Sequence, residues 1–338
     1  MMRKNAYKSM TYKDRKVCVA PMLDWTDRHC RYFHRLLSSH TWLYTEMVTT
    51  GALLYGDVAR HLDFSEEEHP VALQLGGSDP SDLAKCARLG EQWGYDEINL
   101  NCGCPSERVQ KGAFGACLMK ESRLVADCIK AIQDKVSIDV SIKHRIGVDQ
   151  ITSYDFVRDF IGDISRTGCH IFIVHARNAI LKGLSPKENR GIPPLHYDIV
   201  YQLKNDFPEL EIIINGGIET IDDVQDHLKH VDGVMLGRAA YYYPWRLSEM
   251  DSKIYGTDSL ERTRQSVIDA MVHYIEKQIA CFGHKGLKIN SITRHMLGLM
   301  SGVSGARYFR QILSDSQRLA ENNPKLLLDA LEKVTIKE

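Results

Sequence analysis

The sequence contains no apolar run approaching the ~20 residues that a helix needs to cross a bilayer, and residues 1–16 lack the apolar stretch of a secretory signal. These absences predict a cytoplasmic protein without a membrane anchor. Net charge is almost absent as well, because 43 Lys and Arg are balanced by 44 Asp and Glu, for a formal charge of −1. Nucleic-acid binding would therefore depend on where the charges lie, not on their sum.

Signs of disulfides and of metal ligation are also weak. The nine cysteines are an odd number, dispersed through 338 residues, which is typical of reduced thiols in a cytosolic protein. Cys102 and Cys104 form a C-x-C pair, but no second Cys/His pair follows at ligand spacing, so we expect no metal site. Internal repeats and low-complexity segments are lacking too.

Short β-rich runs alternate with helical patterns between Val17 and Arg238. Several runs, such as Ile171–Val174 and Ile212–Ile214, are continuously apolar, which is typical of parallel strands buried on both faces. Eight strand–helix repeats predict an α/β fold, the (β/α)8 or TIM barrel. An open doubly wound sheet is the competing topology, and no GxGxxG follows the first run to support a dinucleotide-binding form of it. The eight runs are Val17–Met22, Leu43–Val48, Val71–Gly76, Glu97–Cys102, Val136–Lys143, His170–His175, Glu211–Asn215 and Gly233–Leu236.

After Pro244 the pattern becomes helical, and we expect a small all-α bundle. The predicted division is an N-terminal extension over residues 1–16, a barrel over 17–247 and a helical domain over 248–338. From Lys277 to Ser314 there is no Asp or Glu, but there are six Lys or Arg. This stretch is either a solvated face balanced by acids nearby or a phosphate-binding surface. The expected helices are Ser259–Cys281, Ile289–Met300, Arg307–Ser314 and Pro324–Val334.

In a barrel of this kind the active-site groups gather at the C-terminal ends of the strands, and nearly every predicted strand here ends in polar or Gly-rich residues. Gly216-Gly217 and Gly237-Arg238 follow the last two strands, where barrels commonly bind phosphate. Glycine lets a phosphate reach backbone N–H groups that a Cβ would shield. The alternative is that these glycines only relieve tight turns, but together they favour a phosphate-bearing cofactor.

Lys143 and His175 would face the same cavity. Beside a flavin ring, a fixed cation such as Lys143 stabilises the negative charge of the reduced ring, and Gln74 would hydrogen-bond its pyrimidine edge. Taken singly, Lys143 fits a salt bridge and His175 a satisfied core residue. Cys104, in a strand-end loop, is interpreted as a reactive thiol. At an unperturbed pKa of roughly 8.5 a thiol is mostly protonated at neutral pH and can act as a general acid, although Cys104 also fits a small buried hydrophobe.

The string N-L-N-C-G-C-P-S at residues 99–106 resembles the active-site loop of the flavin-dependent tRNA-dihydrouridine synthases. Residues 20–27, 174–178, 215–218 and 232–239 resemble further segments of that family. Residues 183–190 and 192–195 are similar to its DusA subfamily, which modifies uridines at positions 20 and 20a of the tRNA D-loop. The similarity covers Val17 to Leu313, nearly the whole chain.

The resemblance implies an FMN-binding barrel, a helical tRNA-binding domain and NADPH or NADH as the reductant; we expect a monomer. It implies that hydride passes from flavin N5 to uracil C6, that Cys104 protonates C5 and that Asn101 fixes the uracil edge. The implied FMN contacts are Pro21, Met22, Leu23, Gln74, Lys143, His175, Asn215, Gly216, Gly217, Gly237 and Arg238. The implied tRNA contacts are Asn101, Lys187, Arg190, Arg307 and Arg310.

Two positions depart from the family pattern. Cys102 replaces an expected apolar residue, and Tyr308-Phe309 lies between the two arginines of the last segment, where a Trp is frequent. Two other functions stay open. A dihydroorotate dehydrogenase-like flavoprotein would share the barrel, the FMN and the cysteine, but it does not account for the acid-free helical stretch. A non-catalytic RNA chaperone built on a barrel would bind RNA without a flavin.

Overall fold

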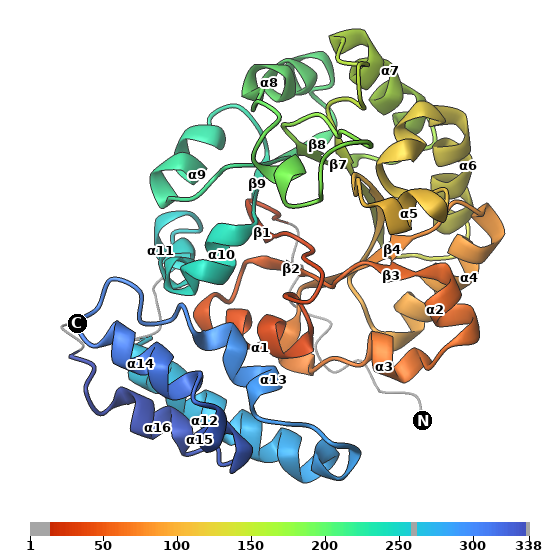
Figure 1. Ribbon diagram of the computed structural model, residues 1–338. Coiled ribbons are helices and arrows are strands. Elements are labelled where there is room, and N and C mark those ends of the chain that lie inside the picture. Colours follow the sequence, from red (N-terminus) through yellow and green to blue (C-terminus); the bar gives the residue numbers. More distant parts are fainter. Residues whose placement is uncertain (1–13, 258–261, 336–338) are drawn as a thin grey trace.

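The computed structural model describes residues 14–257 and 262–335. Parallel strands form a closed barrel surrounded by helices, and the C-terminal helices lie to one side, next to α1 (Arg28–Leu37) and α10 (Arg238–Tyr242) (Figure 1). Within the described residues, no helix is both long and apolar enough to cross a bilayer. The predicted extension over residues 1–16 falls almost wholly outside the described part of the chain.

The barrel wall confirms the predicted TIM barrel, with one strand divided in two. In the described chain the order is β2-β1-β9-β8-β7-β6-β5-β4-β3, all parallel, and pairing of β2 with β4 closes the ring. The predicted run Leu43–Val48 becomes β2 (Trp42–Tyr44) and a short β3 (Val48–Thr49), which both pair with β4. The other strands are β1 (Val17–Val19), β4 (Val71–Gly76), β5 (Glu97–Cys102), β6 (Asp139–Arg145), β7 (Ile171–His175), β8 (Glu211–Asn215) and β9 (Gly233–Leu236).

Successive side chains along each strand alternate between the barrel interior and the layer beneath the helices. Ile171 and Ile173 pack in the same interior cluster as Trp42, whereas Phe172 belongs to the larger core under the helices. The covering helices, besides α1 and α10, are α2 (Thr50–Tyr55), α3 (Val58–Leu62), α4 (Pro80–Trp93), α5 (Glu107–Lys111), α6 (Ser122–Gln133), α7 (Tyr154–Ser165), α8 (Tyr197–Asp206) and α9 (Ile221–His227).

Arg15 closes the N-terminal end of the barrel. Its side chain is only 3% exposed, and its Nε donates to Oε2 of the fully buried Glu97 at 2.8 Å. Asp139 and Glu211 pair with its other nitrogens, and its guanidinium lies 4.1 Å from the centroid of the Trp42 ring. A buried charge is costly unless it is paired and hydrogen-bonded. This cluster therefore satisfies Arg15 and seals the barrel at the end opposite its mouth.

The C-terminal part of the chain is helical, as predicted, with two differences in the described residues. Helix α12 (Arg264–Phe282) buries the apolar stripe that includes Val267, Met271 and Tyr274. The expected helix Ile289–Met300 is shorter, because α13 (Asn290–Thr293) passes into the 3₁₀ turn η6 (Arg294–Met296). The remaining helices are α14 (Ala306–Leu313), α15 (Ser316–Ala320), which the sequence patterns did not predict, and α16 (Leu326–Leu331).

Helix α12 packs directly on the first barrel helix. The rings of Tyr32 and Tyr274 stack with centroids 3.9 Å apart, and the Tyr274 hydroxyl hydrogen-bonds His29 Nδ1 at 2.8 Å. Arg28 adds a hydrogen bond to Gln278 at 3.0 Å. The C-terminal helices are therefore joined to α1 by stacking and by buried hydrogen bonds.

Asp27 ties the start of α1 to the turn after α13. Its Oδ1 accepts from the backbone N–H groups of His29 and Cys30, both at 3.0 Å, and so caps the helix. Its Oδ2 accepts from Arg294 at 2.8 Å and contacts His295 Nε2 at 3.0 Å. Burial alone would raise the pKa of Asp27, but the hydrogen bond and charge of His295 lower it well below its usual range.

Residues 244–257 pack on the barrel before the C-terminal helices begin. They form the 3₁₀ turn η4 (Pro244–Glu249) and α11 (Met250–Lys253). Asp251 accepts hydrogen bonds from Ser38 and Ser39 at the end of α1, and the Tyr255 hydroxyl accepts from Val17 N at 3.0 Å. A helical domain that begins at residue 248 stays a prediction, and these contacts favour a start beyond residue 257.

Candidate active site

Cationic side chains gather at the C-terminal mouth of the barrel without acidic partners. Lys143 and Arg145 lie two residues apart on β6, so they share its inward face. Arg145 is buried and donates to the backbone carbonyls of Gly103, Asn178 and Asn189, and burial lowers its pKa to about 10. Among the described residues no carboxylate forms an ion pair with any of the five cations here, which are Lys143, Arg145, Arg177, Arg190 and Arg238.

Lys143 is held across the mouth by β8. Its Nζ donates to Asn215 Oδ1 at 3.1 Å, and Asn215 is oriented in turn because its Nδ2 donates to Met235 O at 2.7 Å. Burial, together with repulsion from Arg145, lowers the pKa of Lys143 to about 7. An anion at the mouth would restore the charge of this amine.

His175, on the neighbouring β7, is 9% exposed and has an unsatisfied nitrogen. Burial, followed by the positive charges of Arg145 and Lys143, lowers its pKa well below the usual range. Its Nδ1 is buried without a hydrogen-bond partner among the described residues. Buried polar atoms are normally paired, so a ligand at the mouth would satisfy this nitrogen.

The glycines after β8 and β9 shape an open cradle. Gly216 and Gly217 have φ of +118° and +72°, and a Cβ on Gly217 would lie 2.6 Å from Leu195 Cδ1. Gly237 has open space where its Cβ would be, and the next residue, Arg238, donates to Arg190 O at 3.2 Å. Exposed backbone beside unpaired cations is the donor set that a phosphate requires. The mouth therefore carries a donor set that fits the phosphate of a bound cofactor.

Cys104 lies half-buried in the loop after β5, at the same mouth. The loop of Cys104 lies against the buried cation Arg145, whose Nε donates to the backbone oxygen of the preceding residue, Gly103, at 3.2 Å. Its Sγ lies 3.6 Å from Ser106 Oγ. Cys102, by contrast, is fully buried in the core beneath the helices.

Asn101 and Gln74 form the wall next to that loop. Asn101 Oδ1 accepts from the backbone N–H groups of Gly103 and Cys104 at 3.1 and 3.0 Å. Its Nδ2 donates to Gln74 Oε1 at 2.8 Å. Asn101 is only 8% exposed, so the structure places it in the barrel wall and leaves its tRNA contact a prediction.

The loop after β1 forms the rim on the other side. Pro21 and Met22 are half-buried, and Met22 O closes a turn by accepting from Trp25 N at 3.0 Å and Thr26 N at 2.9 Å. Leu23 is 64% exposed. Pro21 and Met22 thus lie at the mouth, whereas a flavin contact by Leu23 remains a prediction that would need its exposed side chain to be covered.

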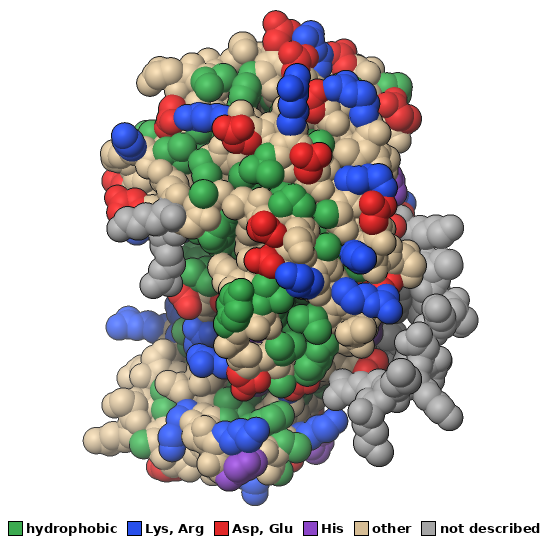
Figure 2. Space-filling view, turned by 90° about the vertical axis from the view of Figure 1, so that its right-hand side faces the viewer, with side chains coloured by type: hydrophobic (Ala, Val, Ile, Leu, Met, Phe, Trp, Pro, Cys, Tyr) green, Lys and Arg blue, Asp and Glu red, His purple; other side chains and the backbone are tan. Residues whose placement is uncertain are grey.

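The predicted tRNA-binding cations fall into two groups. Lys187 and Arg190 lie in the loop after β7 and are exposed, with Arg190 beside the mouth. Arg307 and Arg310 lie one turn apart on the exposed side of α14, whose opposite side buries Phe309, and none of the described residues pairs with them. Viewed from the side of α4 and α6, Lys and Arg side chains gather in a recess at the left edge of the molecule (Figure 2).

The sequence patterns missed two sets of residues, one at the mouth and one in the barrel interior. Arg145 and Arg177 at the mouth were not assigned a role, although both are cations without acidic partners in the described chain. The second set is the polar interior of β5 and β6, with Glu97, Asn99 and Ser141. The alternation in E-I-N-L-N-C at residues 97–102 was the available signal, because it places every second, polar residue on one face.

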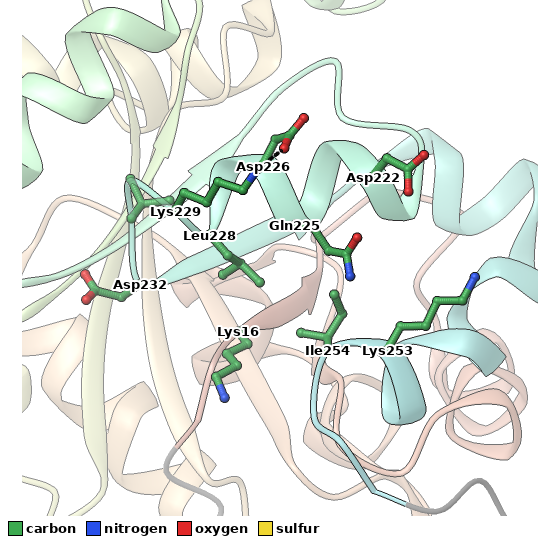
Figure 3. Close-up of a pocket in the computed structure, with 10 residues that line it drawn as sticks. Lys16, Asp222, Gln225, Asp226, Leu228, Lys229, Asp232, Lys253 and Ile254 are labelled. Carbon is green, nitrogen blue, oxygen red and sulfur yellow. Dashed lines mark hydrogen bonds and ion pairs between the residues drawn. The ribbon is translucent and has the colours of Figure 1, made fainter.

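Another pocket, with a volume of about 580 Å³, lies at the opposite end of the barrel, near α9 and α11 (Figure 3). Its lysines are balanced by aspartates, as in the pair Lys229–Asp226 at 2.6 Å, so it lacks the uncompensated charge of the mouth. In residues 14–257 and 262–335, no group of three or more His, Cys, Asp or Glu is placed to hold a metal ion.

The fold and the mouth define a β/α-barrel enzyme with an anion-binding site at the C-terminal ends of its strands. A solved structure of an old yellow enzyme homologue from Zymomonas mobilis has the same fold, with a TM-score of 0.53 and 12% identity over 73% of this chain and 90% of that one. The family model for dihydrouridine synthase (Dus) matches residues 18–335. The chain therefore belongs to the dihydrouridine synthase family.

Curated relatives are similar over nearly their full length. The tRNA-dihydrouridine(20/20a) synthase of Salmonella typhi is 56% identical over 320 residues, which cover 94% of this chain and 95% of the relative. The proteins with the same name from Pseudomonas syringae and Vibrio parahaemolyticus are 56% and 52% identical, over 94% of this chain in both cases and 94% and 97% of the relatives. The predicted family is confirmed.

Proposed function

We propose that this chain reduces uridine to 5,6-dihydrouridine at positions 20 and 20a of the tRNA D-loop, with FMN at the barrel mouth and NADPH as the reductant. The observation that carries this proposal is one mouth that combines cations lacking acidic partners with a half-buried thiol, in a chain of the dihydrouridine synthase family. The names of its relatives supply the uridine positions.

The mouth provides what an anionic flavin needs. When bound there, FMN would supply the hydride that adds to uracil C6. Gly216, Gly217, Gly237 and Arg238 would hold its phosphate. Lys143, oriented by Asn215 at 3.1 Å, would place a positive charge beside the ring.

Cys104 is the proposed proton donor. Saturating the C5–C6 double bond of uracil requires a hydride at C6 and a proton at C5. The thiol would give its proton to C5, which leaves a thiolate near Lys143 and Arg145, whose positive charges stabilise it. The loop is already held for this task, because Asn101 binds its backbone N–H groups.

RNA would reach the mouth through phosphate contacts. A uridine in folded tRNA must leave its stack before both of its faces are accessible. Lys187 and Arg190 would contact the backbone near the extruded nucleotide, and Arg307 and Arg310 would contact a more distant part of the tRNA. Contacts of this kind position an RNA without reading its bases.

The test uses purified full-length chain and tRNA from a bacterial strain that lacks this activity. We expect a yellow protein that, with NADPH, forms dihydrouridine at positions 20 and 20a, mapped by sequencing-based detection. Reduction of free uracil or oxidation of dihydroorotate, with tRNA unchanged, would indicate the dihydroorotate dehydrogenase-like alternative. A colourless protein that binds tRNA would indicate the non-catalytic alternative. Modification at other uridines would contradict the assigned positions.

A further inference from the structure

A continuous line of buried hydrogen bonds crosses the barrel from its sealed end to the Cys104 loop. We call its side chains the polar column, and they are Glu97, Ser141, Asn99, Gln74 and Asn101. The Ser141 hydroxyl donates to Glu97 Oε1, and Asn99 Nδ2 donates to Ser141 Oγ at 2.7 Å. Gln74 Nε2 donates to Asn99 Oδ1 at 2.7 Å, and Asn101 Nδ2 donates to Gln74 Oε1 at 2.8 Å.

The column follows the strand register. Glu97, Asn99 and Asn101 alternate along β5, so they share its inward face. Asn99 lies opposite Gln74 of β4 and Ser141 of β6. All five side chains are at most 8% exposed, so water does not compete for these bonds.

In every hydrogen bond of the column the donor lies on the side of the mouth and the acceptor on the side of Glu97. The residues around Glu97 account for this direction. Arg15 and the Tyr44 hydroxyl, at 2.8 and 2.9 Å, also donate to Glu97, whose carboxylate can only accept. Ser141 must therefore donate to Glu97, and its oxygen accepts from the NH₂ group of Asn99.

Each following amide is then oriented by the one before it. Asn99 turns its oxygen to Gln74, and Gln74 turns its oxygen to Asn101. Asn101 is left with its own oxygen facing the N–H groups of Gly103 and Cys104. A reversed amide at any step would place two donors or two acceptors face to face.

We propose that the Arg15–Glu97 pair, acting through the polar column, positions the Cys104 loop for proton transfer, so that Ser141 and Asn99 are positioning residues for the reaction. This inference rests on the proposed function, because it takes Cys104 as the proton donor. It also means that Asn101 offers a bound ring only an N–H donor, since its oxygen already accepts two hydrogen bonds.

Ser141→Ala tests the column at its smallest link, because it removes one hydroxyl and leaves Arg15–Glu97 intact. Ser141→Thr keeps a hydroxyl and serves as the rescue. Ile173→Val is the matched packing control, since Ile173 is a buried apolar residue of the barrel interior on the adjacent strand. For each protein we would measure melting temperature, flavin absorbance, kcat and KM for tRNA, and the rate at which iodoacetamide alkylates Cys104, read by peptide mass spectrometry.

A misplaced donor costs turnover more than binding, so we expect Ser141→Ala to lower kcat by about 10- to 100-fold with KM for tRNA within about twofold. Its Cys104 alkylation rate should change, whereas Ser141→Thr and Ile173→Val should match the unmodified protein in both readouts. The inference is overturned if Ser141→Ala keeps the kcat and the alkylation rate of Ile173→Val.

The failure of the proposed function would look different. In that case the unmodified protein itself would form no dihydrouridine, and alkylation would decide the structural inference alone. A Cys104 alkylation rate that changes in Ser141→Ala but not in Ile173→Val would support the positioning role of the column. Equal rates in the unmodified protein, Ser141→Ala and Ile173→Val would refute it.

Discussion

Binding of reduced FMN to flavin-free protein should take up a proton at pH 8, because of Lys143. Burial and Arg145 lower the pKa of this amine to about 7 from an ordinary 10.5. At pH 8 the free protein therefore carries about 0.1 proton on Lys143. The negative charge of a reduced flavin ring nearby would move the pKa back up and fill the site, so uptake should approach about 0.9 proton.

His175 and Arg145, the two groups that lower the pKa of Lys143 or lie beside it, do not titrate at this pH. The lowered pKa of His175 keeps its imidazole neutral, and Arg145, with a pKa of about 10, keeps its charge. A phosphate monoester has its second pKa near roughly 6 and is already a dianion. Of these three side chains Lys143 sets the sign of the uptake, and the affinity for reduced FMN should weaken as the pH rises above 7.

Anaerobic isothermal titration of reduced FMN into the flavin-free protein, in pH 8 buffers of different ionisation enthalpy, measures this uptake directly. Lys143→Met removes the titrating amine at similar length, and Lys143→Arg keeps a cation that stays charged throughout. Both variants should show an uptake near zero, with weaker binding for Lys143→Met. Zero uptake in the unmodified protein, or equal uptake in Lys143→Met, would refute the assigned surroundings of this lysine.

Three further predictions concern the thiol, the RNA surface and the cradle. Cys104→Ala should keep the flavin absorbance but lose about 10²- to 10⁴-fold in dihydrouridine formation; near-normal turnover would remove Cys104 from proton donation. Arg307→Ala with Arg310→Ala should weaken tRNA binding and lower the slope of log affinity against log salt by about 1.4 to 1.8; an unchanged slope would move the RNA surface elsewhere. Gly217→Ala should lose bound flavin on gel filtration, because its Cβ would lie 2.6 Å from Leu195 Cδ1 at a φ of +72°; full retention would show that the cradle adapts.

The barrel was predictable because its strands are short, apolar and regularly spaced, as in Ile171–Val174. The division of β2 from β3 was not, since Leu43–Val48 reads as one β-rich run, whereas in the structure β2 pairs with both β1 and β4 and β3 pairs with β4. The shortening of the helix expected at Ile289–Met300 is likewise a tertiary effect. Arg294 and His295 turn towards Asp27, which lies more than 260 residues earlier in the chain.

The site was predictable where chemistry marks a strand end, as at Lys143, His175 and Cys104, and less so inside the barrel. Glu97 and Asn99 look like ordinary polar residues in a strand. Their place in the polar column depends on their neighbours on β4 and β6. Sequence spacing alone does not show that Lys143 lacks an acidic partner. That property emerges only when the surrounding loops are in place.

The carboxylate of Asp27 belongs at once to the first barrel helix and to the turn that leads towards α14. It follows the loop of Pro21 and Met22 by only a few residues, so the rim of the mouth and the turn before α14 share one anchor. An enzyme built in this way would select a nucleotide by its distance along the RNA from the backbone segment that the C-terminal helices would bind, whatever bases lie between.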